Sequence, residues 1–458
     1  MRISLAKSLL PAIFALTAVA TTGAWSRHQD ASVLAPSPPM GWNSWDSWGM
    51  TIDEADFRST VTWFQDHLQR YGWQYVVIDE GWFLEHPDAP AGQQGYTLSR
   101  DGLFTPAVNR FPSAVNGKGF APLAAWVHAL GLKFGIHIVR GIPREAVQQN
   151  LPIAHSHFRA ADAADTTDTC SWNSDNYGVR DNQAGQDYYN SLFDLYAKWG
   201  VDFVKVDCIS SPWKGAQIHM IDRAIDQSGR PMVLSLSPGP TPLADANDVV
   251  RSAALWRISN DMWDVWAKPA DAPSFPQALK NQFPVIAAWE PWADAGHWPD
   301  ADMLPIGYLG PHPGLGQPRR TRFTRDEVRT LMTLWSIGRS PLFIGTNLLH
   351  MDAFTEQTLT NPEVLAVDQN SQNNHVVLNR DNMIVWMASA PEHQGDYIAI
   401  FNTGDTPQTV TYTWQDLGIT YGRCPVRDLW QRQDLGVNNQ ITVTLAPHAA
   451  ALYQAEHP

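Results

Sequence analysis

Short apolar runs alternate with segments of helical spacing over most of the chain, and this order limits the possible folds more than any other feature. The runs lie at 41–44, 75–79, 133–138, 201–207, 232–236, 255–259, near Met303 and at 342–346. A strand followed by a helix, repeated many times, favours a parallel sheet, and about eight repeats favour a closed barrel. We therefore predict a (β/α)8 barrel over residues 39–368, with a doubly wound open sheet as the alternative.

The segment after the first run illustrates how a helix is predicted within this pattern. Residues 51–54 read Thr-Ile-Asp-Glu, which fits a capping box that opens at Thr51. Apolar residues then recur at helical spacing from Phe57 to Leu68, and Gly72 ends the pattern. The segment is therefore predicted to be a helix.

The pattern changes after residue 369. Strand-like runs follow at 376–378, 383–387, 397–402, 409–414 and 441–445, and turn residues such as those at 402–405 separate them. No segment there has the length and spacing of a helix. We predict that residues 369–458 form an antiparallel β-sandwich, for which roughly ninety residues is a usual size.

The first 24 residues have the features of a signal peptide. Arg2 and Lys7 precede an apolar stretch from Leu9 to about Ala20, which ends in an Ala-Val-Ala sequence. Residues 25–38 are then predicted to be a loose leader before the barrel. We expect the mature protein to be secreted or periplasmic. No membrane partner is expected, because no other run of ~18 apolar residues occurs.

Net charge and composition exclude several classes of partner. A formal net charge of −14 argues against nucleic acid and against an anionic membrane surface. The three cysteines form neither a disulfide scaffold nor a zinc-ligand pattern, and no calcium loop occurs, so no metal or cofactor is expected. The 21 tryptophans suit the flat faces of sugar rings, although most of them are expected in the core. The sequence carries no signal for the oligomeric state.

The fourth predicted strand ends in two charged residues. Lys205 and Asp207 lie two positions apart, so their side chains point to the same side of the strand, into the barrel. Charges in that position are unfavourable unless they are paired or used. An acid at the carboxyl end of a barrel strand is typical of a catalytic residue. For a single acid, a structural ion pair or a helix cap is the more common explanation.

Other strands of the predicted barrel also end in polar residues. They are Asp79 and Glu80, His137 and Arg140, Arg257 and Asp261, and Asp300 and Asp302. In a barrel these ends meet at one mouth. Several carboxylates with nearby tryptophans favour glycoside hydrolysis, which needs one carboxylate to attack and one carboxylic acid to protonate the leaving oxygen. A barrel isomerase or aldolase is a weaker alternative, because it would need a phosphate-binding loop or a Schiff-base lysine.

Five segments of the chain resemble glycoside hydrolase family 27. They are Met40–Trp45 (MGWNSW), Val77–Trp82 (VIDEGW), Gly131–His137 (GLKFGIH), Trp199–Cys208 (WGVDFVKVDC) and Asp300–Leu304 (DADML). They occur in the order found in the family, and the resemblance covers nearly the whole mature chain, including the β-sandwich. The family comprises α-galactosidases, α-N-acetylgalactosaminidases, β-L-arabinopyranosidases and isomalto-dextranases.

The resemblance implies roles for individual residues. Asp207 matches the nucleophile of the family and Asp261 its acid/base, which implies a covalent glycosyl-enzyme, retention of configuration and a carboxylate separation of ~5–5.5 Å. The positions expected to contact the sugar are Trp45, Asp79, Lys205 and Arg257, and His137 stands where some members have a tyrosine. Cys170 and Cys208 match a disulfide of the family, which leaves Cys424 as a free thiol.

Two departures from the family pattern bear on the substrate. The usual adjacent aspartates are Asp79 and Glu80 here, in the position that holds the 4- and 6-hydroxyls of galactose. Glutamate is one methylene longer and fills space where the hydroxymethyl group would lie, and β-L-arabinopyranose lacks that group. Ser237 stands where galactosidases often have a glutamate near the 2-position. The leading expectation is an exo-acting α-D-galactosidase; a β-L-arabinopyranosidase is the alternative, and a non-catalytic sugar-binding protein a further one.

Overall fold

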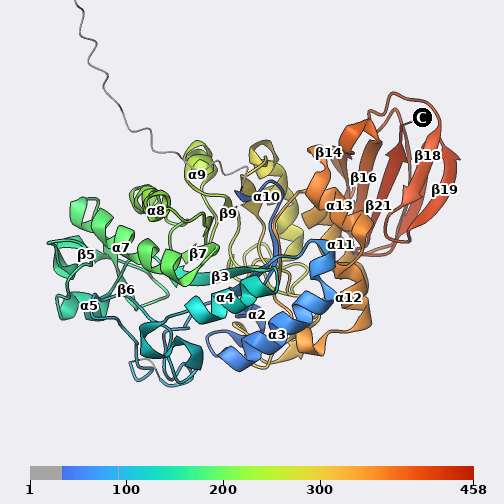
Figure 1. Ribbon diagram of the computed structural model, residues 1–458. Coiled ribbons are helices and arrows are strands. Elements are labelled where there is room, and N and C mark those ends of the chain that lie inside the picture. The colour runs from blue at the N-terminus through green and yellow to red at the C-terminus, as the bar shows by residue number, and fades with distance from the viewer. Residues whose placement is uncertain (1–33, 91, 458) are drawn as a thin grey trace, which may run out of the picture.

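The computed structural model describes residues 34–90 and 92–457 (Figure 1). The predicted signal peptide lies outside the described residues, as does most of the predicted leader. The described end of that leader packs on the barrel, because the carbonyl of Ala35 accepts hydrogen bonds from Trp298 Nε1 at 2.9 Å and from Gly296 N at 2.8 Å. Within the described ranges, none of the helices has both the length and the apolar character needed to span a membrane.

Eight parallel strands form the predicted barrel, in the order β10-β9-β8-β7-β3-β2-β1-β13. They are β1 (Met40–Asn43), β2 (Tyr75–Ile78), β3 (Lys133–Val139), β7 (Phe203–Asp207), β8 (Val233–Leu236), β9 (Leu255–Arg257), β10 (Trp298–Asp300) and β13 (Leu342–Ile344). The ring closes just after β10, where Leu304 forms a parallel bridge with Ile344 and donates to the carbonyl of Phe343 at 2.7 Å.

Two local predictions are wrong by a few residues. The seventh strand is β10, which ends at Asp300, whereas the residue after Met303, Leu304, belongs to the closing segment. The first long helix is capped by Asp53, whose side chain accepts from Asp56 N at 2.8 Å. Thr51 is not the cap, because its hydroxyl donates to the carbonyl of Trp48 in the preceding turn, at 2.8 Å.

Helices surround the barrel on its outer side (Figure 1). They are α3 (Glu54–His67), α4 (Ala121–Ala129), α7 (Gln183–Trp199), α8 (Gly215–Ser228), α9 (Ala246–Ser252), α10 (Gln282–Trp289), α11 (Arg325–Ile337), α12 (Ala353–Leu359) and α13 (Pro362–Asn370), and α2 (Trp45–Trp48) is a single turn after β1. The apolar stripe of α7 illustrates the packing: Tyr189, Phe193 and Tyr196 are buried on one face.

Aromatic side chains fill the inside of the barrel below the polar strand ends. Tyr75 of β2, Phe203 of β7 and Phe343 of β13 contact one another, with ring centroids 5.6 Å apart for Tyr75–Phe203 and 5.2 Å for Phe203–Phe343. Phe203, Lys205 and Asp207 occupy every second position of β7, so their side chains point to the same face, into the barrel, as predicted. The aromatic layer therefore closes one end of the barrel, and the charged residues above it face only the carboxyl-end mouth.

A long insertion separates β3 from α7. It contains α5 (Arg144–Gln148), α6 (Ala160–Ala163) and a small sheet of β4 (Ile142–Pro143), β6 (Asn176–Val179) and β5 (Ala164–Thr169). The loop between β5 and β6 begins at Cys170, which forms the predicted disulfide with Cys208 (Cα–Cα 6.0 Å). This disulfide ties the insertion to the residue that follows Asp207. Cys424 is free and buried. A second small hairpin, β11 (Tyr308–Leu309) with β12 (Arg319–Arg320), lies between β10 and α11.

The C-terminal residues form the predicted antiparallel β-sandwich, beside the barrel (Figure 1). One layer contains β14 (Gln372–Arg380), β15 (Met383–Ser389), β16 (Gly395–Asn402), β21 (Ala450–Glu456), β18 (Cys424–Asp428) and β19 (Gln433–Asn438), and the other is the hairpin β17 (Gln408–Thr413) with β20 (Gln440–Leu445). Apolar side chains of both layers share one core. On its other side the large sheet packs on the barrel, where the rings of Phe283 and Phe401 lie 5.0 Å apart.

Candidate active site

A cavity of about 410 Å³ opens at the carboxyl ends of the barrel strands. Seven of the nine predicted site residues line it: Trp45, Asp79, Glu80, Lys205, Asp207, Arg257 and Asp261. The lining is completed by Asp46, Trp172, Pro238, Asn260, Met262, Trp263, Phe275, Asp302 and Met303. The other two predicted residues, His137 and Ser237, are not among the lining; both are buried and act on Asp207.

Asp207 ends β7, and two basic side chains stabilise its charge. His137 Nε2 lies 3.0 Å from Asp207 Oδ2. Burial opposes ionisation of Asp207, but Lys205 and then His137 outweigh it, and the pKa of Asp207 lies below its ordinary value. The other oxygen, Oδ1, is buried, and the Ser237 hydroxyl also contributes to the lowered pKa of Asp207. The surroundings of Asp207 therefore favour its ionised form, which is the form that can act as a nucleophile.

Lys205 and Asp79 form an ion pair beside Asp207. Lys205 Nζ lies 3.0 Å from Asp79 Oδ2, which also accepts from Asn43 Nδ2 at 2.7 Å. Burial alone would raise the pKa of Asp79, but Lys205 and His137 outweigh it and lower that pKa. Conversely, burial disfavours the charge of Lys205, but Asp79 and Asp207 outweigh it and raise the pKa of the lysine. Both side chains are therefore charged, and Asp79 is an acceptor for sugar hydroxyls.

The pKa of His137 depends on the same carboxylates, Asp79 and Asp207. Burial lowers the pKa of His137, but Asp79 and Asp207 outweigh the effect and raise it above its ordinary value. The ring is 1% exposed, and its backbone carbonyl accepts a hydrogen bond from Trp82 Nε1 at 2.8 Å. The two carboxylates therefore favour the protonated form of His137, and its burial fixes the ring beside Asp207.

Glu80 differs from its neighbours in its environment. It is 7% exposed, and its Oε1 accepts a hydrogen bond from Asn173 Nδ2 at 2.7 Å. Burial is the main cause that raises the pKa of Glu80 to about 7; His137 opposes this, and Asp207 and Asp79 reinforce it. The carboxyl group of Glu80 is thus fixed at the cavity wall by a neutral amide.

Arg257 places the second predicted catalytic carboxylate. Its Nη1 lies 3.1 Å from Asp261 Oδ1, and its Nη2 lies 2.6 Å from Asp302 Oδ2. The same oxygen of Asp302 accepts from Met262 N at 2.6 Å. Burial disfavours the charge of Arg257, but Asp302 and Asp261 outweigh it and raise its pKa. The guanidinium therefore holds Asp261 in a fixed position at the cavity wall.

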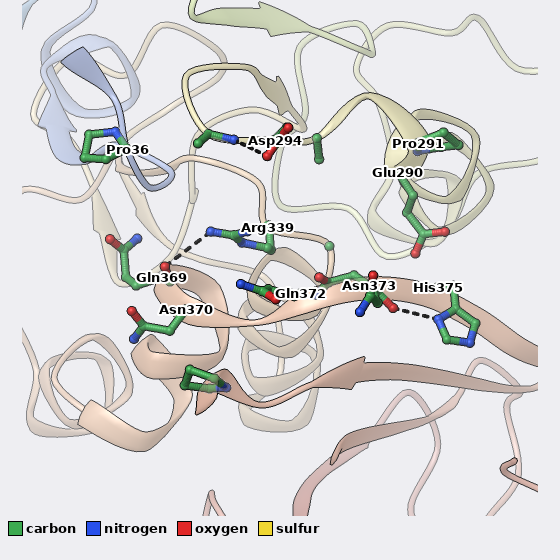
Figure 2. A pocket seen from close by; sticks show the side chains of 15 residues that line it. Pro36, Glu290, Pro291, Asp294, Arg339, Gln369, Asn370, Gln372, Asn373 and His375 are labelled. Carbon is green, nitrogen blue, oxygen red and sulfur yellow. Dashed lines mark hydrogen bonds between the residues drawn. The ribbon is translucent and has the colours of Figure 1, made fainter. Parts of the chain in front are cut away.

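A larger cavity, of about 770 Å³, lies between the barrel and β14 (Figure 2). Figure 2 shows Glu290 and Asp294 from the barrel side and Asn373 and His375 from the start of β14. Its central cation, Arg339, donates to the backbone carbonyls of Asp368 (3.0 Å) and Gln369 (3.2 Å). This cavity contains none of the predicted site residues, and its arginine is occupied by the backbone. It is therefore not the candidate active site.

Several residues at the site were not predicted from the sequence. Asn173 and Trp172 follow Cys170 by three and two positions, so the predicted disulfide is a signal that could have placed their loop near Asp207. Phe275 lies in a loop without any periodic pattern, and nothing in the sequence marked it. Asp46 follows the predicted Trp45 and lines the cavity beside it. Within the described residues, no group of three or more His, Cys, Asp or Glu side chains is arranged to hold a metal.

Comparison with known proteins decides the family. The family model for alpha galactosidase A matches residues 169–370, and the model for the alpha galactosidase C-terminal beta sandwich domain matches residues 380–455. A solved structure of a GH27 β-L-arabinopyranosidase from Geobacillus stearothermophilus is 43% identical, with a TM-score of 0.88, covering 93% of this chain and 98% of that chain. The chain belongs to glycoside hydrolase family 27.

More distant members of family 27 include plant enzymes. An alpha-galactosidase of Cyamopsis tetragonoloba is 26% identical over 436 residues, which are 93% of this chain and 88% of the relative. An alpha-galactosidase of Coffea arabica is 28% identical over 435 residues, 92% of this chain and 94% of the relative. The predicted family and reaction class are thereby confirmed: the protein is a glycosyl hydrolase that acts on a carbohydrate.

Proposed function

We propose that this family 27 hydrolase is a retaining exo-glycosidase that releases terminal β-L-arabinopyranose, with α-D-galactosides as slower substrates. Glu80 carries the choice of sugar. Its carboxyl group stands beside Asp79, held by Asn173 at 2.7 Å, in the position where the family contacts the 4- and 6-hydroxyls. The extra methylene fills the space of a hydroxymethyl group, which favours a pentopyranose over galactose.

The relatives support the same order of substrates. The Geobacillus β-L-arabinopyranosidase, of which a variant was solved with arabinose, is 42% identical to this chain, whereas the two plant alpha-galactosidases are 26% and 28% identical. The expectation from the sequence placed the galactosidase first. The fixed position of Glu80 is the reason to reverse that order.

In the first step, Asp207 attacks the anomeric carbon and the bond from that carbon to the leaving oxygen breaks. Asp261 donates its proton to the leaving oxygen, which departs as an alcohol. Lys205 and His137 keep Asp207 ionised for this attack, and Arg257 holds Asp261 in place at 3.1 Å. The products of the step are a glycosyl ester of Asp207 and the free leaving group.

In the second step, water attacks the anomeric carbon of the ester. Asp261, now ionised, accepts a proton from this water, and Asp207 leaves as a carboxylate. Two inversions at one carbon retain the configuration of the substrate. The closed aromatic layer below the site leaves the mouth as the route for this water.

The sugar assignment is tested with a pair of p-nitrophenyl glycosides. We expect kcat/KM for the β-L-arabinopyranoside to exceed that for the α-D-galactoside. Glu80→Asp should move the ratio toward galactose by roughly 10- to 200-fold, the usual effect of one methylene in a pocket. Glu145→Asp, on α5 of the insertion and outside the cavity, is the matched control and should leave the ratio unchanged. A wild-type enzyme that prefers the galactoside, with no response to Glu80→Asp, would refute the assignment.

The mechanism is tested on Asp207. The Asp207→Ala variant should lose hydrolysis, and azide should restore cleavage of an activated arabinoside by attacking from the vacated face, which gives the inverted glycosyl azide. Proton NMR of the first product of the wild-type enzyme should show the anomer of the substrate. Release of the opposite anomer would exclude a retaining mechanism.

Export also belongs to this proposal. It follows from the predicted signal peptide at residues 1–24, and recovery of a protein that lacks these residues from the culture medium or periplasm would support it. Recovery of the uncleaved chain in the cytoplasm alone would contradict it.

A further inference from the structure

Two aromatic side chains at the rim of the catalytic cavity take no part in the reaction described above. Trp172 and Phe275 line the cavity, and each is 48% exposed. The large apolar side chains that stand out as exposed in residues 34–90 and 92–457 are otherwise aliphatic: Val108, Val115, Leu243, Leu349, Leu435 and Val437. Exposed aromatic surface is unfavourable in water. Its collection at one opening therefore indicates contact with a ligand.

Trp172 is anchored next to the nucleophile. The disulfide between Cys170 and Cys208 ties the start of its loop to the residue that follows Asp207. Asn173, directly after Trp172, donates to Glu80 in the cavity wall at 2.7 Å. Fixed points therefore lie on both sides of the tryptophan, which holds the ring at the rim.

Phe275 is anchored next to the acid/base. Two residues after it, Gln277 N donates to the carbonyl of Asp261 at 2.7 Å. Lys268 Nζ donates to the carbonyl of Pro276 at 2.6 Å, which closes the loop from the other side. The position of the phenylalanine is thus coupled directly to the backbone of the residue that protonates the leaving group.

The geometry of the reaction says what such a pair of rings contacts. Asp261 must reach the glycosidic oxygen, so the leaving group emerges from the cavity on the side of Asp261, where Phe275 stands. We propose that Trp172 and Phe275 form a leaving-group subsite that stacks a ring with a flat apolar face, either a pyranosyl or an aryl group. This proposal rests on the proposed exo-glycosidase function and adds the part of the substrate that the sugar cavity does not contact.

The test compares leaving groups on one sugar. The substrates are methyl, p-nitrophenyl and galactosyl-linked β-L-arabinopyranosides. The measured quantity is kcat/KM, because it covers substrate binding and departure of the leaving group and excludes hydrolysis of the glycosyl-enzyme. We expect Trp172→Leu and Phe275→Leu each to reduce kcat/KM about tenfold for the ring-bearing substrates, equivalent to about 1.4 kcal/mol, and less than twofold for the methyl glycoside. Leu349→Ala, an equally exposed residue outside the cavity, should change neither.

The inhibition constant of free L-arabinose separates a subsite from a general disturbance. Arabinose occupies only the sugar cavity, so its inhibition constant should stay the same in both variants. Equal losses for all three substrates, with weaker inhibition by arabinose, would show that the rings only shape the sugar cavity and would overturn the proposal. A loss confined to the galactosyl-linked or to the p-nitrophenyl substrate would support it and identify the ring as pyranosyl or aryl.

The same series on α-D-galactosides keeps this test independent of the sugar assignment. The wild-type preference between the two sugars decides the proposed function. The dependence of the variants on the leaving group, measured on whichever sugar is cleaved faster, decides the subsite.

Discussion

Replacing His137 by glutamine should raise the pKa of Asp207 and move the acid limb of the pH–rate profile upward. The two groups lie 3.0 Å apart, and at an effective dielectric constant of about 20 that distance corresponds to about 5.5 kcal/mol of attraction. Relaxation reduces such values, and losing one partner of a buried pair typically costs about 3–5 kcal/mol. At about 1.4 kcal/mol per pH unit, and with Lys205 still in place, we expect an upward shift of about two pH units.

The assay is kcat/KM from about pH 3 to pH 9, with His128→Gln as the control. His128 forms a similar pair with Asp202, at 2.7 Å, but outside the cavity. His137→Gln should lose activity most strongly at acid pH and recover part of it near neutrality, whereas the control should follow the wild-type profile. An acid limb that does not move in His137→Gln would refute the reasoning that this imidazolium keeps Asp207 ionised.

The same pair has a defined effect on stability. Asp207 has a lowered pKa, so its contribution is present above its ordinary pKa and is lost as the pH falls. His137 has a raised pKa, so its contribution is present in full below its ordinary value of 6.5 and is lost as the pH rises through the folded value. The free energy of unfolding that His137→Gln loses, measured with urea, should therefore be largest at mildly acid pH, between the ordinary pKa of Asp207 and that of His137.

Three further predictions concern Glu80 and its loop. The pKa of Glu80 rises from 4.5 to about 7 on folding, so this group lowers the free energy of unfolding of the wild type as the pH rises from 4.5 to 7. Over that range the free energy of unfolding of Glu80→Gln, measured with urea, should gain up to about 3 kcal/mol relative to wild type. Asn173→Ala should raise KM for the arabinopyranoside several-fold with little change in kcat, because it frees Glu80 without touching Asp207. Cys170→Ser opens a loop of 38 residues and should cost about 4 kcal/mol, seen as a lower Tm that reductant does not lower further. The first prediction would be contradicted by a stability difference between Glu80→Gln and wild type that does not vary with pH. The second would be contradicted by an unchanged KM in Asn173→Ala, and the third by an unchanged Tm in Cys170→Ser.

The barrel could be predicted because its strands are buried on both faces and therefore read as continuous apolar runs. The seventh strand was misplaced because Trp-Pro-Asp does not form such a run. In the sandwich, β18, β19 and β21 were not predicted. β19 is largely exposed, and β21 carries three small alanines in place of a clear alternation. Their places are set by pairing with distant strands, for which a local pattern has no signal.

The candidate site could be predicted to the extent that strand ends carry it. The pairing within the site could not: Lys205, expected among the sugar contacts, forms its direct ion pair with Asp79, and His137 lies beside Asp207. Several opposite charges within a few ångströms allow more than one pairing, and side-chain packing decides between them. Asn173 was missed for a different reason, because a loop that is folded by a disulfide has no period.

The difference between Glu80 and the charged cluster explains how one reaction can serve different sugars. Asp79 and Asp207 face two basic side chains, Lys205 and His137, so their ionisation depends on one another and a change in any of them disturbs the nucleophile. Glu80 instead has a neutral amide as its direct hydrogen-bond partner. Its length can change without removing a counter-charge from Asp207. Shortening Glu80 to aspartate thus leaves Lys205 and His137, the counter-charges of Asp207, in place. For this reason we expect Glu80→Asp to alter substrate preference while the pH profile of catalysis stays close to that of the wild type.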